Sequence, residues 1–413
     1  MSTGKTAFCG GLLIDGTGAP AVEDSLVLVD GEKIVYAGKR KEIPEGYEVR
    51  DIKGKTIMPG LIDAHLHFSG NLTDNDTDWV TEDNIQKAVV AVQQAHECLE
   101  AGLTTVGEIS RFGIHIRNMI EAKVMKGPRV VASGLGFCAT CSHGDSHKVS
   151  IEQNREGHPW GECVDSPWDL RKAVRRRLRE NPDAIKIWAT GGGIWRWETA
   201  MDQHYTMEEV QAVVDECKMR HVPVWSHCFG SAYNSVKAGV DLIVHGQSLD
   251  DETLDMMAEK GIALCPTINF MPAWLETFPP KYDPALHDPY EGETVAEKDL
   301  NRIYANLRKA NERGILLTIG SDSFNSQMTP YGVTAVGELT AFVEKAGISE
   351  MDTIVAATLN GAKVLRVDEI TGSLEAGKSA DLLVIGGNPL ENIREICVEN
   401  MEVIMKEGEF IRG

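Results

Sequence analysis

Residues 58–67 read Met58-Pro59-Gly60-Leu61-Ile62-Asp63-Ala64-His65-Leu66-His67, an apolar run that ends in two histidines. A Pro-Gly turn followed by apolar residues predicts a short buried strand. Side chains two apart on a strand point to the same face, so His65 and His67 would project together. Paired imidazoles at a strand end can bind a divalent metal, but a lone His-x-His is a weak signal. The rest of the chain decides the interpretation.

Further apolar segments alternate with stretches of helical character. They lie at residues 103–106, 129–132, 184–188, 222–227, 241–245, 262–265 and 315–319. Helical patterns such as 207–220 and 250–260 fill the intervals, and Gly261 is typical of a helix C-terminus. About eight βα units over roughly 300 residues predict an α/β fold, a (β/α)8 TIM barrel. A doubly wound open sheet is the alternative, but it would seldom gather so many metal-type residues at one point.

Both ends of the chain consist of short strands and glycine-containing turns. The Asp30-Gly31 turn between two apolar runs predicts a hairpin, and residues 379–386 and 402–408 have the same character. Such pieces bury little surface alone, so we expect the two ends to pack against each other.

Composition narrows the class of protein. The chain has 413 residues, is 42% hydrophobic and 25% charged, and carries a formal net charge of −21, which argues against nucleic acid and anionic membranes as partners. No apolar run is long enough to cross a membrane, and no signal peptide is apparent. The nine cysteines are odd in number, and Cys138-x-x-Cys141 has no second pair at zinc-ribbon spacing. We expect free thiols, with a zinc or redox pair as the alternative, and a cytoplasmic location.

Other metal-type residues coincide with the ends of the predicted strands. Lys186 lies in the fourth strand, His227 and His245 end the fifth and sixth, and Asp322 follows the eighth. Singly, each has a structural explanation: a core histidine, a helix-capping aspartate or a solvent-facing lysine. Because all strand C-termini of a barrel surround one mouth, their joint occurrence favours a metal centre.

Lys186 indicates which kind of centre to expect. A protonated ammonium cannot bind a cation, but burial and nearby positive charge lower the pKa of a lysine and leave a neutral amine. That amine can add carbon dioxide, and the resulting N6-carboxylated Lys186 could bridge two divalent ions about 3.5–4 Å apart. We expect two Zn²⁺ ions, although histidine and carboxylate ligands also accept manganese, iron or cobalt.

These motifs resemble those of the amidohydrolase superfamily, and within it the imidazolonepropionase-related and Xaa-Pro dipeptidase (prolidase) group. The matching stretches are residues 59–67, Lys186 with Ala189-Thr190-Gly191-Gly192, His227, His245-Gly246, Gly320-Ser321-Asp322 and the C-terminal return at residues 372–382. The resemblance implies a barrel over residues 59–367 and a small β-sandwich domain built from residues 1–58 plus 368–413. It also implies a homo-oligomer.

The same resemblance assigns roles to the site residues. His65, His67 and Asp322 would bind one metal, His227 and His245 the other, and carboxylated Lys186 would bridge them. Asp322, Lys186 and His245 would form the catalytic set, with Asp322 passing a proton from the attacking water to the leaving amine.

Candidate substrate-binding residues lie in three segments. His143, in a Gly-rich loop like that of the prolidase group, could contact a substrate carboxylate or carbonyl. Trp195 and Trp197 could wall a pocket and Arg196 could clamp a carboxylate, unless the tryptophans only pack the loop onto the barrel. Phe229 stands where some prolidase-like members carry a tyrosine, and Tyr233 is a weak substitute. Phe270, Met271 and Trp274 would add an apolar wall.

We therefore expect a binuclear metal-dependent hydrolase that cleaves a C–N amide or peptide bond in a small molecule with metal-bound hydroxide, as a prolidase or an N-acyl amino acid hydrolase. Hydrolysis of a cyclic amide (a lactam, enamide or hydantoin-like ring) is the first alternative. A deaminase or imidazolonepropionase-type enzyme is less favoured. Related deaminases carry a glutamate three residues after the fifth-strand histidine, where this chain has Gly230, and lack the bridging lysine; imidazolonepropionase is usually mononuclear. A non-catalytic barrel is the last alternative.

Overall fold

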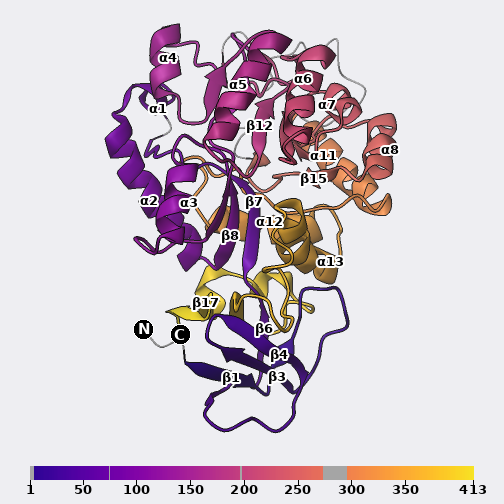
Figure 1. Cartoon of the computed structure of the whole chain (residues 1–413). Coiled ribbons are helices and arrows are strands. Elements are labelled where there is room, and N and C mark those ends of the chain that lie inside the picture. Colours follow the sequence, from indigo (N-terminus) through magenta and orange to yellow (C-terminus); the bar gives the residue numbers. More distant parts are fainter. Residues whose placement is uncertain (1–3, 74, 196–197, 273–294) are drawn as a thin grey trace.

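The computed structural model describes residues 4–73, 75–195, 198–272 and 295–413 (Figure 1). Strands from the two ends of the chain build two sheets at one pole of the molecule. The first has the order β4-β3-β1-β5 and the second the order β18-β17-β16-β6-β2. The strands are β1 (Lys5–Cys9), β2 (Leu12–Leu13), β3 (Ser25–Asp30), β4 (Lys33–Lys39), β5 (Glu48–Asp51), β6 (Lys55–Pro59), β16 (Leu382–Gly386), β17 (Met401–Lys406) and β18 (Glu409–Arg412).

The two ends of the chain meet as expected. β6 pairs antiparallel with β16, so that Met58 lies opposite Leu383. The predicted hairpin is confirmed, because β3 and β4 pair antiparallel and Gly31 takes the left-handed φ of 61° that the turn requires. One hydrophobic cluster draws side chains from both sheets, among them Phe8, Val27, Ile57, Leu382 and Met405.

Two further sheets contain only parallel pairs. One has the order β7-β8-β9 and the other β11-β10-β12-β13-β14-β15. Their strands are β7 (Leu61–Leu66), β8 (Leu103–Glu108), β9 (Arg129–Ala132), β10 (Gly136–Cys138), β11 (Gly161–Cys163), β12 (Ile185–Trp188), β13 (Val224–Cys228), β14 (Leu242–His245) and β15 (Ala263–Cys265). Seven of the predicted strands are thus present, and β10 and β11 are additional.

The eighth predicted strand, residues 315–319, forms only a bridge between Leu317 and Leu264. Its backbone nevertheless reaches both neighbours: Thr318 N donates to Leu264 O and Ala64 N donates to Ile319 O, both at 3.0 Å. The segment therefore runs between β15 and β7 without forming a regular ladder. Among the described residues the parallel strands make two open sheets, so the α/β class is observed and the closed barrel only in part.

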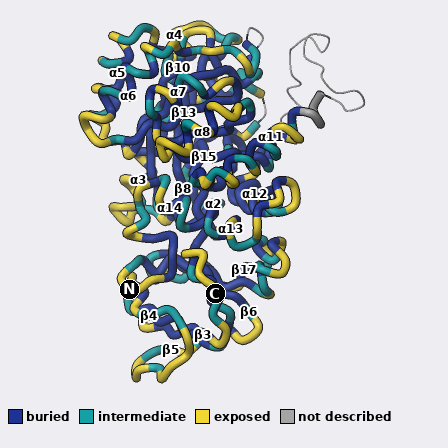
Figure 2. The backbone as a smooth tube through the Cα atoms, turned by 90° about the vertical axis from the view of Figure 1, so that its right-hand side faces the viewer, coloured by how far each residue is buried: buried dark blue, intermediate teal, exposed yellow. Residues whose placement is uncertain are grey.

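Helices follow the strands and cover the sheets, with exposed residues on the outside and buried strands within (Figure 2). They are α1 (Asp78–Thr81), α2 (Asn84–Glu100), α3 (Gly113–Glu121), α4 (Ile151–Gly157), α5 (Pro167–Arg179), α6 (Met207–Lys218), α7 (Tyr233–Ala238), α8 (Asp251–Lys260), α11 (Val295–Glu312), α12 (Val333–Glu344), α13 (Glu350–Val355) and α14 (Gly361–Val364), with a π-turn η1 (Ala356–Asn360) and 3₁₀ turns η2 (Ile393–Glu395) and η3 (Val398–Asn400).

The helix signals in the sequence act as expected. A capping box between Thr206 and Glu209 starts α6, and Gly261 ends α8 with a φ of 68°. The nine cysteines are free thiols. None of the helices in the described part of the chain combines the length and apolarity needed to cross a bilayer.

A buried ion pair joins the terminal sheets to the parallel strands. Arg129 at the start of β9 donates to Asp381 at 2.8 Å, and Asp381 also accepts from Thr371 Oγ1 and from Glu407 N. Burial alone would raise the pKa of Asp381, but Arg129 and these hydrogen bonds lower it below its usual value of 3.8. The ionised carboxylate thus stabilises the fold above the unfolded-state pKa, and this contribution is lost as pH falls through the lower folded-state pKa.

We predict that Asp381→Asn lowers the free energy of unfolding by about 3 kcal/mol at pH 7, because Arg129 loses its buried partner and keeps only the partly exposed Glu407 at 2.9 Å. Denaturant titration measures this difference, which should shrink towards pH 3. Asp24→Asn, which breaks the exposed Arg40–Asp24 pair at 3.2 Å, is the matched control and should leave the denaturation midpoint unchanged. Equal effects of the two substitutions would contradict the bridging role of Asp381.

Candidate metal centre

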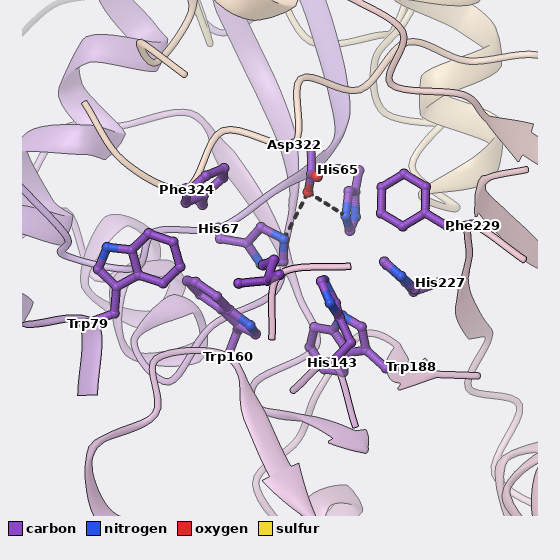
Figure 3. A pocket seen from close by; sticks show the side chains of 11 residues that line it. His65, His67, Trp79, His143, Trp160, Trp188, His227, Phe229, Asp322 and Phe324 are labelled. Atoms are coloured by element: carbon purple, nitrogen blue, oxygen red, sulfur yellow. Dashed lines mark hydrogen bonds and ion pairs between the residues drawn. The ribbon is translucent and has the colours of Figure 1, made fainter. Parts of the chain in front are cut away.

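The predicted ligands lie at or near the C-terminal ends of the parallel strands, and four of them, His65, His67, His227 and Asp322, line one pocket (Figure 3). His65 lies in β7 and His67 just beyond it, Lys186 in β12, His227 in β13 and His245 at the end of β14, and Asp322 follows the segment 315–319. The ligand atoms of His65, His245 and Asp322 all lie within 4.8 Å of one another.

Asp322 contacts both histidines of the first strand. Its Oδ1 lies 3.1 Å from His65 Nε2 and 3.1 Å from His67 Nε2. His67 Nδ1 donates to the carbonyl oxygen of Ile109 at 2.7 Å, so in a neutral ring Nε2 carries no proton. His67 Nε2 and Asp322 Oδ1 are then two lone-pair atoms in contact. Only a proton or a cation between them makes this contact favourable.

His245 is oriented in the same manner. Its Nδ1 lies 2.6 Å from Thr267 Oγ1, and the Thr267 hydroxyl donates to Pro266 O at 2.8 Å. The hydroxyl therefore accepts from His245 Nδ1–H, and His245 Nε2 keeps its lone pair. Second partners of this kind orient metal-binding histidines in proteins.

His227 and Lys186 complete the group. The His227 ring lies 4.6 Å from the His245 ring, and its Nε2 donates to Gly191 O at 3.2 Å, which leaves Nδ1 with the lone pair. Lys186 is 1% exposed, and its Nζ has no hydrogen-bond partner among the described residues. Gly136 allows this placement, because a Cβ there would lie 2.8 Å from Lys186 Cγ.

Burial sets the protonation states. It lowers the pKa of His65 to about 3, with the Lys186 charge adding to the effect, and lowers the pKa of His227 and His245 well below 6.5. It also lowers the pKa of Lys186 to about 8. Burial would raise the pKa of Asp322, but the contacts of its carboxylate with the His65 and His67 rings bring it well below 3.8. Neutral imidazoles beside an ionised carboxylate are the states that cation binding requires.

Left-handed backbone conformations aim several of these groups. The φ angles of His245, Thr267 and Asp322 are 73°, 50° and 52°, which non-glycine residues seldom adopt. Asp63 stabilises the conformation at Asp322, because its carboxylate accepts hydrogen bonds from His65 N at 3.0 Å and from Ser321 N at 3.1 Å. Burial raises the pKa of Asp63 to about 7. The sequence analysis gave Asp63 no role.

The pocket above the centre has polar and aromatic walls. Eleven residues line it: His65, His67, Trp79, His143, Trp160, Trp188, Ile194, His227, Phe229, Asp322 and Phe324. Lys186 and His245 are not among them. The aromatic members Trp79, Trp160, Trp188 and Phe324 were not predicted, because a lone aromatic residue in a sequence indicates packing as readily as binding.

His143, a predicted substrate-binding residue, lines the pocket. Its ring stacks on His227 at 4.7 Å, and its Nδ1 donates to Glu198 Oε1 at 3.0 Å. Gly192 makes room for the ring, because a Cβ at residue 192 would lie 2.0 Å from His143 Cε1. The role of His143 in substrate binding stays a prediction.

Glu198 is a further residue that the sequence analysis missed. It is 1% exposed and also accepts from the backbone N–H groups of Gly192, Ile194 and Trp195 at 3.1–3.4 Å. Burial opposes its ionisation, but His143 lowers the pKa of Glu198 below its usual value. Glu198 therefore fixes both the loop and the orientation of the His143 ring.

Trp195 and Tyr233, the other predicted substrate-binding residues that the structure describes, are not among the residues that line the pocket. Trp195 is buried and its indole Nε1 donates to His143 O at 2.8 Å, so it supports the His143 loop. Tyr233 starts α7, with Lys237 Nζ 5.3 Å from its ring. Arg196 and Trp197 lie outside the described residues, as does Trp274.

Several known proteins are similar to this chain over most of its length. Ochratoxinase of Aspergillus niger is 28% identical over 440 residues, covering 99% of this chain and 87% of that protein. A crystal structure of a Xaa-Pro dipeptidase with bound methionine in the active site is 30% identical, with a TM-score of 0.84 and coverage of 99% and 100%. The 5-methylthioadenosine/S-adenosylhomocysteine deaminase of Halalkalibacterium halodurans is 26% identical over 369 residues, covering 82% and 74%.

A family model described as the amidohydrolase family matches residues 56–411. The family resemblance stated from the sequence is thereby confirmed, and with it an enzyme of the hydrolase class whose family is metal-dependent. This chain belongs to the amidohydrolase family.

Proposed function

We propose that this chain is a binuclear metal-dependent hydrolase that cleaves a C–N amide or peptide bond in a small substrate. The observation that carries the proposal is the contact between His67 Nε2 and Asp322 Oδ1, 3.1 Å apart, beside a His67 Nδ1 that already lies 2.7 Å from the Ile109 carbonyl oxygen. The buried Lys186 Nζ, which has no hydrogen-bond partner among the described residues, supports it. A cation at Asp322 and a carboxylated lysine would satisfy groups that the described chain leaves unpaired.

His65, His67 and Asp322 would hold one cation, and His227 and His245 the other, with Lys186 between them. When bound, two divalent ions activate water at neutral pH and polarise a carbonyl group. The Lys186 amine would attack carbon dioxide, forming an N–C bond and releasing a proton, and the carbamate would be the shared anionic ligand. The lowered pKa of Lys186, about 8, supplies some neutral amine at pH 7.

The protein's own groups have separate tasks. The Asp322 carboxylate would accept a proton from the attacking water and deliver it to the leaving nitrogen, for which its ionised state is suited. His143, with Nδ1 held by Glu198, would offer Nε2 to a substrate carbonyl or carboxylate oxygen. Thr267 and the Ile109 carbonyl keep His245 and His67 in the tautomers that leave Nε2 free.

Deamination is the second candidate, because one relative is a deaminase. The structure disfavours it at residue 230, where the related deaminases carry a glutamate. Gly230 packs against the backbone, and a Cβ there would lie 2.8 Å from Ala200 O. Cyclic-amide hydrolysis uses the same centre as linear-amide hydrolysis and differs only in substrate shape.

We also propose that the chain forms a closed barrel and a terminal β-sandwich domain. The two open parallel sheets and the segment 315–319 would together make the eight-stranded barrel of residues 59–367. The terminal sheets, which share a hydrophobic cluster, would make the β-sandwich of residues 1–58 plus 368–413. The cytoplasmic location and the homo-oligomer stay predictions from the sequence.

We predict that purified protein hydrolyses members of a panel of N-acyl amino acids, Xaa-Pro dipeptides, lactams and hydantoins, while aminopyrimidines and adenosine derivatives release no ammonia. Liquid chromatography follows the products, and elemental analysis should find about two divalent ions per chain. Ammonia release without amide cleavage would favour the deaminase.

Lys186→Ala should lower kcat/KM by at least about 1,000-fold and halve the metal content, because the shared ligand is lost. A short carboxylic acid should restore part of the activity by taking the place of the carbamate. Carbon NMR of wild-type protein in ¹³C-bicarbonate should show one carbamate signal that is missing in Lys186→Ala. Unchanged activity and metal content in the variant would refute the bridging role.

Thr267→Val should weaken metal binding by about 10–100-fold, because His245 Nδ1 loses its acceptor while the side-chain shape is kept. Thr267→Ser retains the hydroxyl and is the control, with wild-type affinity expected. Competition against a chromophoric chelator measures both. Equal affinities of the Val and Ser variants would show that the hydroxyl does not orient His245.

A further inference from the structure

Three aromatic rings form one wall of the pocket, on the side of His67 (Figure 3). We call Trp79, Trp160 and Phe324 the aromatic trio. Ring centroids lie 5.6 Å apart for Trp79 and Trp160, 5.4 Å for Trp79 and Phe324, and 6.1 Å for Trp160 and Phe324. These separations are within the range of favourable aromatic contacts.

The trio adjoins the candidate metal centre. The Trp160 ring lies 5.4 Å from the His67 ring at an angle of 46°. Phe324 follows Asp322 by two residues, and its carbonyl oxygen accepts from Ser69 Oγ, two residues after His67. A substrate whose scissile bond reaches Asp322 would therefore place one of its substituents against these rings.

A buried lysine holds the trio in place. Lys87 of α2 is 0% exposed, and its Nζ donates to Trp79 O at 2.7 Å and to Gly157 O at 2.9 Å. It thereby ties α1, which carries Trp79, to the end of α4, three residues before Trp160. Trp79 Nε1 donates to Thr73 O at 2.8 Å. The wall is preformed, which lowers the entropic cost of binding.

The two walls differ in chemistry. His143 and His227 stand opposite the trio, with Trp188 and Phe229. Among the described lining residues, the carboxylate of Asp322 and the imidazoles are the ionisable groups, and no lysine or arginine lines the trio side. An anionic substituent would lose hydration there without gaining a partner.

We propose that the aromatic trio is a subsite for a planar, uncharged aromatic group attached to one side of the scissile C–N bond. The cleaved bond is that of the proposed function, on which this part of the inference rests. Binding at the subsite does not depend on catalysis. The subsite predicts that the enzyme acts on amides that carry an aromatic acyl or amine substituent.

Binding of a ligand without a C–N bond tests the subsite independently of catalysis. 2-Acetylnaphthalene and its saturated decalin counterpart have the same skeleton and carbonyl group, but only the first is planar and aromatic. Isothermal titration of metal-loaded wild-type enzyme should give about tenfold tighter binding of the naphthyl ketone. Trp160→Leu should reduce this ratio to within about twofold. Equal binding of the two ketones by wild-type enzyme would overturn the proposal.

Phe324→Leu and Phe229→Leu make the same chemical change on opposite walls. The preference for the naphthyl ketone should fall about threefold in Phe324→Leu and persist in Phe229→Leu. These two variants test the subsite if Trp160→Leu does not fold. An equal loss in both would also overturn the proposal.

Substrate pairs then connect the subsite with turnover. Benzoyl replaces cyclohexanecarbonyl on the acyl side in one pair, and phenylalanine replaces cyclohexylalanine on the amine side in the other. One pair should show about a tenfold aromatic preference in kcat/KM, lost in Trp160→Leu. Preferential binding of the naphthyl ketone without cleavage of any amide would uphold the subsite and refute the proposed hydrolysis. Amide cleavage without an aromatic preference in either assay would uphold the hydrolysis and refute the subsite.

Discussion

The contact that the centre depends on is Asp322 Oδ1 against two imidazole nitrogens, each at 3.1 Å. The Ile109 carbonyl takes the proton of His67 on its other nitrogen, so His67 has none to give to Asp322 as a neutral ring. His65 has an unpaired Nδ1 in either tautomer. A buried polar group without a partner costs about 1–3 kcal/mol, and several meet here. Hydrogen bonds of the surrounding backbone keep these groups together in spite of this cost.

Asp63 fixes the backbone around Asp322. Its carboxylate joins the N–H groups of His65 and Ser321, while Asp322 N donates to His65 O and His67 N donates to Ser323 O, both at 2.8 Å. The left-handed φ of Asp322 is thus enforced by bonds to β7. Glu338 has a similar role for the turn after β15, because it accepts from Ile268 N and Asn269 N next to Thr267. Burial raises the pKa of Glu338 to about 8.

The sequence predicted what is local and missed what depends on distant contacts. His65, Lys186, His227 and His245 could be predicted as neighbours because strand ends are visible as apolar runs, and parallel strands bring their ends together. The segment 315–319 was overestimated as a strand because apolar character does not report ladder pairing; only Leu317 bridges. Glu198 could not be found, since its partner His143 lies 55 residues away and no periodicity links them. Trp79 and Trp160 meet only through folding.

Lys87 and Lys186 show why burial and pKa do not define a role by themselves. Both side chains are at most 1% exposed, and burial lowers the pKa of each to about 8. Lys87 Nζ donates to two carbonyl oxygens, which stabilise the ammonium form and make it a structural tie. Lys186 Nζ has no hydrogen-bond partner among the described residues, so neither protonation state is satisfied by the chain. The two lysines therefore differ in the acceptors around the nitrogen: the Lys87 ammonium has two, and the Lys186 amine would gain partners only through the proposed carboxylation.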